Sequence, residues 1–182
     1  MTEFYRNKNF TGFTLLELMV TISILAISLS LAVPAMGDFI QNQRLRSDSG
    51  RLFMDLLYAR SMAINQGQQI IICPSNSGSE CSDEPTWELG WLLFIDTNND
   101  REYQPTEQRL RVSAAMETLS AHSSIYRRKI RFFPDGSAAG SAATITICDP
   151  RGEKFARALV IANSGRVRQV RQSDQGIELV CS

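Results

Sequence analysis

The longest uncharged stretch of this chain determines how its N-terminal region can fold. From Leu18 to Gly37 there are 20 residues without a charged side chain. As an α-helix rising about 1.5 Å per residue, this stretch would cover roughly 30 Å, the thickness of the hydrocarbon core of a membrane. The sequence therefore predicts a helix that spans a membrane once.

A single carboxylate stands at the start of this predicted helix. Glu17 directly precedes the uncharged stretch, and no Lys or Arg lies between Lys8 and Arg44 to pair with it. A carboxylate inside a membrane is costly without a nearby cation. Cleavage after Gly12 would create an ammonium group on Phe13, on the same helix face as Glu17 or within reach of a neighbouring copy's Glu17. Such a cleavage would supply the missing cation. A secretory signal peptide is disfavoured, because the apolar run is too long for the apolar region of a signal peptide.

The motif Gly-Phe-Thr-Leu-Leu-Glu at residues 12–17, with the apolar run behind it, resembles the leader and N-terminal helix of type IV pilins and pseudopilins. The resemblance implies cleavage after Gly12 by a prepilin peptidase and N-methylation of Phe13. It also implies that Glu17 pairs with the N-terminus of a neighbouring subunit during filament assembly. Pro34 matches the position at which these helices bend, and a proline removes one backbone hydrogen bond from a helix.

Positive charge before the apolar run predicts the orientation in the membrane. Arg6 and Lys8 place the N-terminus in the cytoplasm, so the chain after Phe39 lies outside the inner membrane. We expect a single-pass inner-membrane protein before assembly, and a location in the periplasm or at the cell surface within a pilus. The predicted organisation is a leader at 1–12, a transmembrane and assembly helix at 13–39, and a globular domain at 40–182.

The cysteines fit an oxidising compartment. There are four, Cys73, Cys81, Cys148 and Cys181, and none has the Cys-x-x-Cys spacing of zinc sites or redox dithiols. Four cysteines allow three pairings. Proximity in sequence favours Cys73 with Cys81 and Cys148 with Cys181.

The globular domain is predicted to begin as an amphipathic helix, over 40–66, and to be mainly β over 67–182. Apolar residues recur at helical spacing (Leu45, Leu52, Phe53, Leu56, Leu57, Ala63 and Ile64), and Gly67 is a suitable C-terminal cap. The predicted strands are Gln68–Cys73, Gly90–Ile95, Leu110–Val112, Lys129–Phe133, Thr144–Cys148, Ala156–Ala162, Arg166–Val170 and Ile177–Cys181. The expected fold class is α+β, a long N-terminal helix packed on an antiparallel sheet domain.

Four motifs of the globular domain resemble the FimT/GspH group of minor pilins and pseudopilins. They are Ile72-Cys73-Pro74-Ser75, the stretch from Trp87 to Asp96, Phe133-Pro134-Asp135-Gly136, and the stretch from Ser164 to Arg168. The resemblance covers nearly the whole chain.

The zero net charge of the chain conceals an asymmetry. From Glu80 to Glu107 there are eight acidic residues and one basic residue, whereas from Tyr126 to Arg171 there are ten Lys or Arg and three acids. Such a split suggests an acidic partner for the C-terminal region, or else a basic face in contact with solvent alone.

The spacing of Arg166 and Arg168 sharpens this expectation. Two residues apart on a strand, they project from one face about 6.6 Å apart, close to the spacing of two phosphates, while Val167 points to the core. Regular alternation would bury Arg171, so we expect the strand to end or bulge near Gln169 and turn Arg171 outward.

FimT-like minor pilins of natural transformation carry a Gly-Arg-x-Arg element that binds DNA, and Gly165-Arg166-Val167-Arg168 matches it. The resemblance implies binding of double-stranded DNA. Because no aromatic residues are interleaved with the arginines, we expect phosphate contacts and little sequence preference. The predicted site is Gly165, Arg166 and Arg168, supported by Arg171, Arg157 and Lys154. The alternative is a structural pseudopilin of a type II secretion system, whose basic face meets acidic neighbouring subunits.

Two other groups of residues are weaker candidates. Asp96 to Asp100 with Glu107 has the spacing of a calcium loop, but Arg101 stands where such loops need Gly and Pro105 interrupts it, so we expect a polar hairpin loop. His122 is the sole histidine and predicts no metal site. With the cysteines oxidised no activated nucleophile is visible, so we expect neither an enzyme nor a cofactor.

Overall fold

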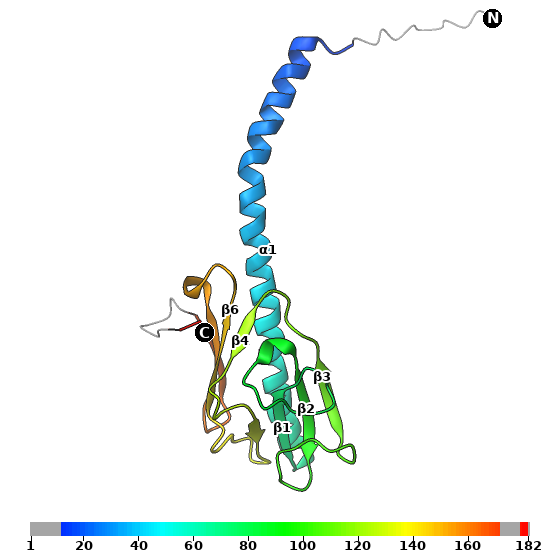
Figure 1. The fold of residues 1–182 in the computed structure, drawn as a ribbon, viewed down its shortest axis with the longest axis vertical. Coiled ribbons are helices and arrows are strands. Elements are labelled where there is room, and N and C mark those ends of the chain that lie inside the picture. The colour runs from blue at the N-terminus through cyan, green and yellow to red at the C-terminus, as the bar shows by residue number, and fades with distance from the viewer. Residues whose placement is uncertain (1–11, 172–178, 182) are drawn as a thin grey trace, which may run out of the picture. The chain divides into compact units, whose positions relative to one another are not determined.

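The computed structural model describes residues 12–171 and 179–181 (Figure 1). The chain divides into two compact units, Met1–Ile40 and Gln41–Ser182. One helix, α1 (Leu15–Gln66), contributes residues to both units.

The part of α1 in the first unit is long and apolar enough to cross a membrane. Thr14 caps its start, since the Glu17 N–H donates to the Thr14 hydroxyl at 3.2 Å. Hydroxyls farther along donate to carbonyls one turn back, as Ser23 does to Met19 at 2.7 Å. Such bonds satisfy polar groups that lipid cannot. The helix continues through residue 34, and a bend at Pro34 stays a prediction.

The part of α1 in the second unit is amphipathic. Its buried apolar residues are Leu45, Leu52, Leu56, Ala59 and Ala63, whereas Ile64 is half exposed. The helix ends at Gln66, and Gly67 follows with a φ of +63°, a conformation that glycine adopts without strain. The predicted end of the helix is confirmed.

Eight strands in the described residues form two antiparallel four-stranded sheets (Figure 1). The first sheet has the order β3-β2-β1-β5, and the second has the order β4-β6-β7-β8. The strands are β1 (Gln69–Pro74), β2 (Trp91–Asp96), β3 (Arg109–Ser113), β4 (Ser120–His122), β5 (Ile130–Phe132), β6 (Ala143–Cys148), β7 (Arg157–Ile161) and β8 (Val167–Arg171). Two short 3₁₀ helices are η1 (Trp87–Leu89) and η2 (Glu153–Phe155).

The α+β class is confirmed, with a helix on antiparallel strands. Seven of the predicted strands are present within one or two residues of their expected bounds. Strand β4 was not predicted, and residues 179–181 form no strand, while residues 177 and 178 lie outside the described residues.

The main core of the second unit lies where α1 packs against both sheets. It contains Leu52 and Leu56 of the helix, Ile72 of the first sheet, and Leu159 and Val167 of the second. The alternation along each strand sends these side chains inward and their neighbours to the opposite face.

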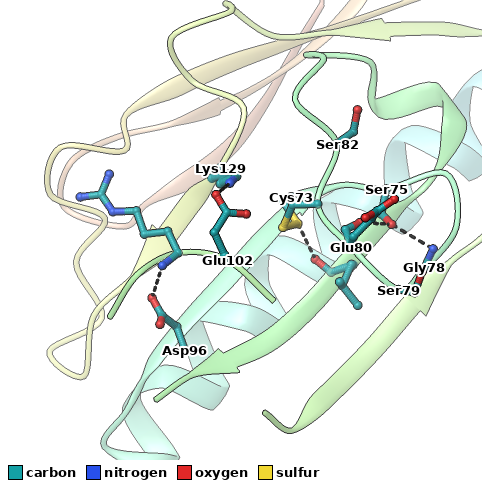
Figure 2. The surroundings of a disulfide bond; sticks show 12 residues. Cys73, Ser75, Gly78, Ser79, Glu80, Ser82, Asp96, Glu102 and Lys129 are labelled. Carbon is teal, nitrogen blue, oxygen red and sulfur yellow. Dashed lines mark hydrogen bonds and ion pairs between the residues drawn. A yellow bond between two sulfur atoms is a disulfide. The ribbon is translucent and has the colours of Figure 1, made fainter. Parts of the chain in front are cut away.

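The opposite face of each sheet has its own small apolar cluster beside a disulfide. On the first sheet Ile71, Leu92 and Phe94 pack near Cys73, which is bonded to Cys81 with a Cα separation of 5.6 Å. Figure 2 shows the loop around this bridge, in which the Ser75 hydroxyl donates to the Glu80 carbonyl at 2.6 Å and accepts from the Gly78 N–H at 2.9 Å.

On the second sheet the outer cluster contains Ala158, Val170 and Leu179. Cys148 of β6 is bonded to Cys181, with a Cα separation of 6.0 Å, and this bond holds the C-terminal residues beside the sheet. The pairing is the one that sequence proximity favoured, and no cysteine is left free.

Candidate nucleic-acid interface

The hairpin between β7 and β8 carries the Gly-Arg-x-Arg element. Gly165 has a φ of +74°, and its N–H donates to the Ala162 carbonyl at 2.8 Å, which closes the turn. A side chain at Gly165 would meet the Gly136 carbonyl oxygen at 1.9 Å, so only glycine fits. The element therefore needs its glycine for the shape of the turn.

A second turn, at residues 136–140, packs against the hairpin. The N–H groups of Ala138 and Gly140 donate to the Asn163 carbonyl at 2.9 Å and to the Asn163 side-chain oxygen at 3.2 Å. Arg60, in the last turns of α1, donates through Nε to the Gly136 carbonyl at 2.8 Å. These contacts fix the hairpin tip at the end of α1, which we call the distal end of the globular unit.

Arg166 and Arg168 project from the outer face of the second sheet. Both are exposed, and with Val160, Ala162 and Ser164 they line a shallow open hollow. Within the part of the chain that the structure describes, neither guanidinium has a carboxylate or hydrogen-bond partner. Two unpaired cations on one strand face can contact successive phosphates.

The prediction that the strand ends or bulges near Gln169 is wrong. β7 and β8 pair in unbroken register from Ile161 with Val167 to Arg157 with Arg171. Val170 points outward, as regular alternation requires, but it is buried there in the outer cluster with Leu179. The reasoning from sequence could not foresee this cover, because it comes from residues far along the chain.

Arg171 and Arg157 therefore lie on the opposite face of the sheet from Arg166 and Arg168. They are direct cross-strand neighbours on the face that meets α1. Burial lowers the pKa of Arg157, and the nearby charges of Arg171 and Arg46 lower it further. The three supporting residues named from sequence do not converge with the hairpin pair.

Lys154 lies farther still from the hairpin tip. It belongs to η2, which precedes the start of β7, whereas the tip follows the end of that strand. Close by, the Arg151 guanidinium donates to the Asn42 side-chain oxygen at 2.9 Å, at the start of the globular unit. We call this the proximal end of the globular unit. Arg46 of the proximal end and Arg60 of the distal end are separated by about 21 Å along the axis of α1.

The loop between β2 and β3 uses its carboxylates for its own backbone. Glu107 accepts from the N–H groups of Thr97 at 2.9 Å and Gln104 at 3.2 Å, and Asp96 accepts from the Arg101 N–H at 3.2 Å. In the described ranges no group of three metal-ligating side chains is found. The arrangement fits the polar hairpin loop that was expected.

His122 is part of a structural contact. Its Nε2 lies 3.4 Å from Glu88 Oε1, and the other oxygen of Glu88 accepts the Ala121 N–H at 3.1 Å. The residues of the processing motif are exposed: Gly12 and Phe13 precede α1, and Glu17 lies in its first turn. Their processing and assembly roles stay predictions.

Sequence reasoning missed a buried polar cluster that joins α1 to the first sheet. Asp55 is almost fully buried, and it accepts from Trp91 Nε1 at 2.8 Å and Ser113 Oγ at 2.7 Å. Arg111 pairs with the same carboxylate, and its guanidinium lies 4.4 Å from the Tyr58 ring centroid. An acidic residue within an apolar helical stripe was the available signal.

Comparison with known families matches two models. Residues 48–165 match the family described as Type II transport protein GspH, and residues 7–33 match the prokaryotic N-terminal methylation motif. The first match covers more than half of the chain.

Two relatives are similar over most of the sequence. A pilin-like protein, PilA1 of Thermus thermophilus, is 28% identical over 170 residues, which cover 91% of this chain and 94% of that protein. The type II secretion system protein H of Xanthomonas campestris pv. campestris is 27% identical over 142 residues, which cover 77% of this chain and 73% of that protein.

Two solved structures share the fold. The type IV minor pilin FimU of Pseudomonas aeruginosa superposes with a TM-score of 0.60 at 22% identity, covering 75% of this chain and 95% of that one. The minor pseudopilin EpsH of the Vibrio cholerae type 2 secretion system gives a TM-score of 0.51 at 10% identity, covering 72% and 99%. At these identities the likeness shows the fold alone.

Proposed function

Since the chain belongs to the GspH family and is a minor pilin or pseudopilin, we propose that it is a minor type IV pilin that binds double-stranded DNA for uptake in natural transformation. The family implies contact with other pilin subunits. The methylation motif and the apolar helix suggest membrane anchoring followed by incorporation into a pilus. Processing by a prepilin peptidase belongs to the same proposal.

One observation carries the DNA-binding part of this proposal. Arg166 and Arg168 are exposed together on the hairpin at the distal end, with no anionic partner among the described residues. The planar guanidinium group is pre-organised for phosphate, so little side-chain freedom is lost for each hydrogen bond that it forms. The neighbouring Val160 and Ala162 offer no ring for base stacking, so binding would depend on the backbone and be insensitive to sequence.

The test is titration of fluorescent duplex DNA with the full chain in micelles of an uncharged detergent, over a series of salt concentrations. Each phosphate contact contributes about 0.9 to the slope of log K against log salt. The double variant Arg166→Gln/Arg168→Gln should therefore lower that slope by about 2, equally on unrelated duplex sequences.

The matched control is Arg46→Gln/Arg157→Gln, which removes two arginines of the proximal end whose side chains have no partner in the described ranges. It should change neither affinity nor slope. If the hairpin variant keeps its affinity and slope, or if the unaltered chain fails to bind DNA at low salt, the DNA-binding proposal is wrong.

A second function has its own support. The relative from Xanthomonas campestris is a type II secretion system protein, and it covers most of this chain. In a secretion pseudopilus the basic sheet edge would contact acidic neighbouring subunits. Loss of protein secretion on deletion of the gene, with DNA uptake unchanged, would favour this alternative.

A further inference from the structure

We infer that the proximal end of the globular unit is a docking surface for an anionic phospholipid membrane, formed by Arg46, Lys154, Arg157 and Phe155. This surface, the proximal cationic surface, is separate from the proposed DNA site, and it depends only on anchoring of the chain by its apolar helix.

The cations of this surface have no anionic partner in the described part of the protein. Among the described residues, no carboxylate lies within ion-pair distance of Arg46, Lys154 or Arg157. Arg157 is half buried beside its cross-strand neighbour Arg171, and Arg46 on α1 lies close enough for its charge to lower the pKa of Arg157. Like charges gathered in this way repel one another, so an external anion is the favourable partner.

Two acids lie at the same end, and one of them is ion-paired. Asp149 is buried and paired with Arg151. Glu153 is exposed and accepts the Cys181 N–H at 3.3 Å, but it has no cationic partner among the described residues. Its single negative charge stands against the three charges of Arg46, Lys154 and Arg157, so the proximal cationic surface keeps a net positive charge.

An aromatic side chain accompanies these cations. Phe155 is 36% exposed, and its ring centroid lies 4.0 Å from the Arg151 guanidinium and 5.9 Å from the Lys154 ammonium. A partly exposed phenylalanine between cations is the combination with which proteins bind the headgroup region, where the ring enters the acyl boundary and the cations contact phosphates.

The cations of this surface begin shortly after the apolar stretch in the sequence. Arg46 follows Gly37, the last residue of the uncharged stretch, by only nine residues. Cations that follow a membrane anchor so closely in sequence are attracted to anionic headgroups at the membrane surface.

The experiment uses the full chain reconstituted in vesicles, with Phe155→Trp as a reporter. The native Trp87 and Trp91 are fully buried and give a constant background. Lipids brominated on their acyl chains quench tryptophan that reaches them. Quenching of the reporter should be weak in phosphatidylcholine vesicles and should rise when phosphatidylglycerol is included.

The triple change Arg46→Gln/Lys154→Gln/Arg157→Gln in the reporter background should abolish this rise. Each cation near an anionic surface contributes about fivefold to the ratio of docked to undocked protein, so three give on the order of a hundredfold. Arg166→Gln/Arg168→Gln at the distal end is the matched control and should leave the rise intact.

Three outcomes would overturn the inference: quenching that does not depend on phosphatidylglycerol, no quenching in either vesicle, or quenching that requires a high protein-to-lipid ratio and so reports a second copy. A loss of DNA affinity in the triple variant, comparable to that of the hairpin variant, would assign these cations to DNA instead. Failure of DNA binding by the unaltered chain would leave the vesicle result unaffected, so the two proposals fail separately.

Discussion

Two glycines of the distal end share a backbone conformation but differ in the space available for a side chain. Gly165 and Gly140 have φ values of +74° and +72°, so a side chain would meet the same backbone strain at either position. At Gly140 the space is empty within 4 Å, whereas at Gly165 the Gly136 carbonyl oxygen lies 1.9 Å from where a Cβ would be.

Alanine at these positions should therefore have unequal effects. Gly140→Ala should cost about 1 kcal/mol, the strain of a left-handed residue. Gly165→Ala should cost at least about 3 kcal/mol, because the supporting turn must also move, and it should weaken DNA binding. Urea unfolding followed by the fluorescence of the buried tryptophans measures both, and equal losses would contradict the steric argument.

Asp55 connects α1 to the first sheet through side-chain hydrogen bonds and an ion pair. Its carboxylate is buried and accepts three side-chain donors, from Trp91, Ser113 and Arg111. Asp55→Ala should destabilise the fold by roughly 3 kcal/mol, since it leaves these donors unpaired.

The exposed Glu84, whose side chain makes no hydrogen bond or ion pair in the described structure, provides the control. Glu84→Ala should change the free energy of unfolding by less than about 0.5 kcal/mol. If Asp55→Ala lowers the free energy of unfolding by as little as this, water would have replaced the Asp55 carboxylate as the partner of the three donors.

At the scale of elements, the end of β2 contains an unfavourable arrangement of acceptors. Asp96 is buried, and its Oδ1 has no hydrogen-bond partner among the described residues. Its direct cross-strand neighbour Gln69 also has a buried side-chain oxygen without a partner. Burial raises the pKa of Asp96, because the charged form is poorly solvated there.

A raised carboxyl pKa makes folding less favourable as pH rises, because the folded state binds the proton more tightly than the unfolded state. Asp96→Asn removes this effect and supplies a donor. The variant should be about 1 kcal/mol more stable than the unaltered chain at pH 7. The advantage should shrink as pH falls toward about 4, the ordinary range of an aspartate. Unfolding of both proteins across this pH range is the measurement, and a difference that grows in acid would contradict the assignment.

The elements themselves were largely predictable from sequence, because helical periodicity, Gly67 and runs of Ile, Val and Phe act locally. Ser120–His122 was missed, since Ser, Ala and His carry no strand signal and β4 forms through its pairing with β6. The division into two sheets depends on pairings between distant segments, such as β1 with β5, which no local pattern reveals.

The site was predictable in part for the same reason. The alternation of Arg166, Val167 and Arg168 is local and was read correctly in the strand. The positions of Arg157, Arg171 and Lys154 depend on which face and which end of the sheet each occupies. The face and the end of the sheet are set by the tertiary fold, so the local sequence does not predict them.

At the scale of the whole molecule, the Cys148–Cys181 disulfide joins the C-terminal residues to the second sheet. In the chain-entropy model it contributes roughly 3.8 kcal/mol, and the shorter Cys73–Cys81 loop contributes roughly 2.6 kcal/mol. Cys148→Ser/Cys181→Ser should therefore lower the free energy of unfolding more than Cys73→Ser/Cys81→Ser does. It should also admit a hydrophobic dye to the cluster around Val170, which Leu179 then no longer covers.

The comparison requires urea unfolding of both double variants in the same micelles, with dye binding measured on the folded proteins. A larger loss for Cys73→Ser/Cys81→Ser than for Cys148→Ser/Cys181→Ser would show that local packing, and not loop length, dominates.

Strand β8 is the last strand of its sheet in the described structure, and it carries arginines on both faces. An edge strand exposes unpaired backbone groups to which a strand of another molecule can add, and charged side chains discourage such addition. Arginines on both faces of β8 therefore disfavour the addition of a strand from another molecule at this edge. Variants that remove them should be polar, because β-branched apolar replacements would turn this edge into a site of aggregation.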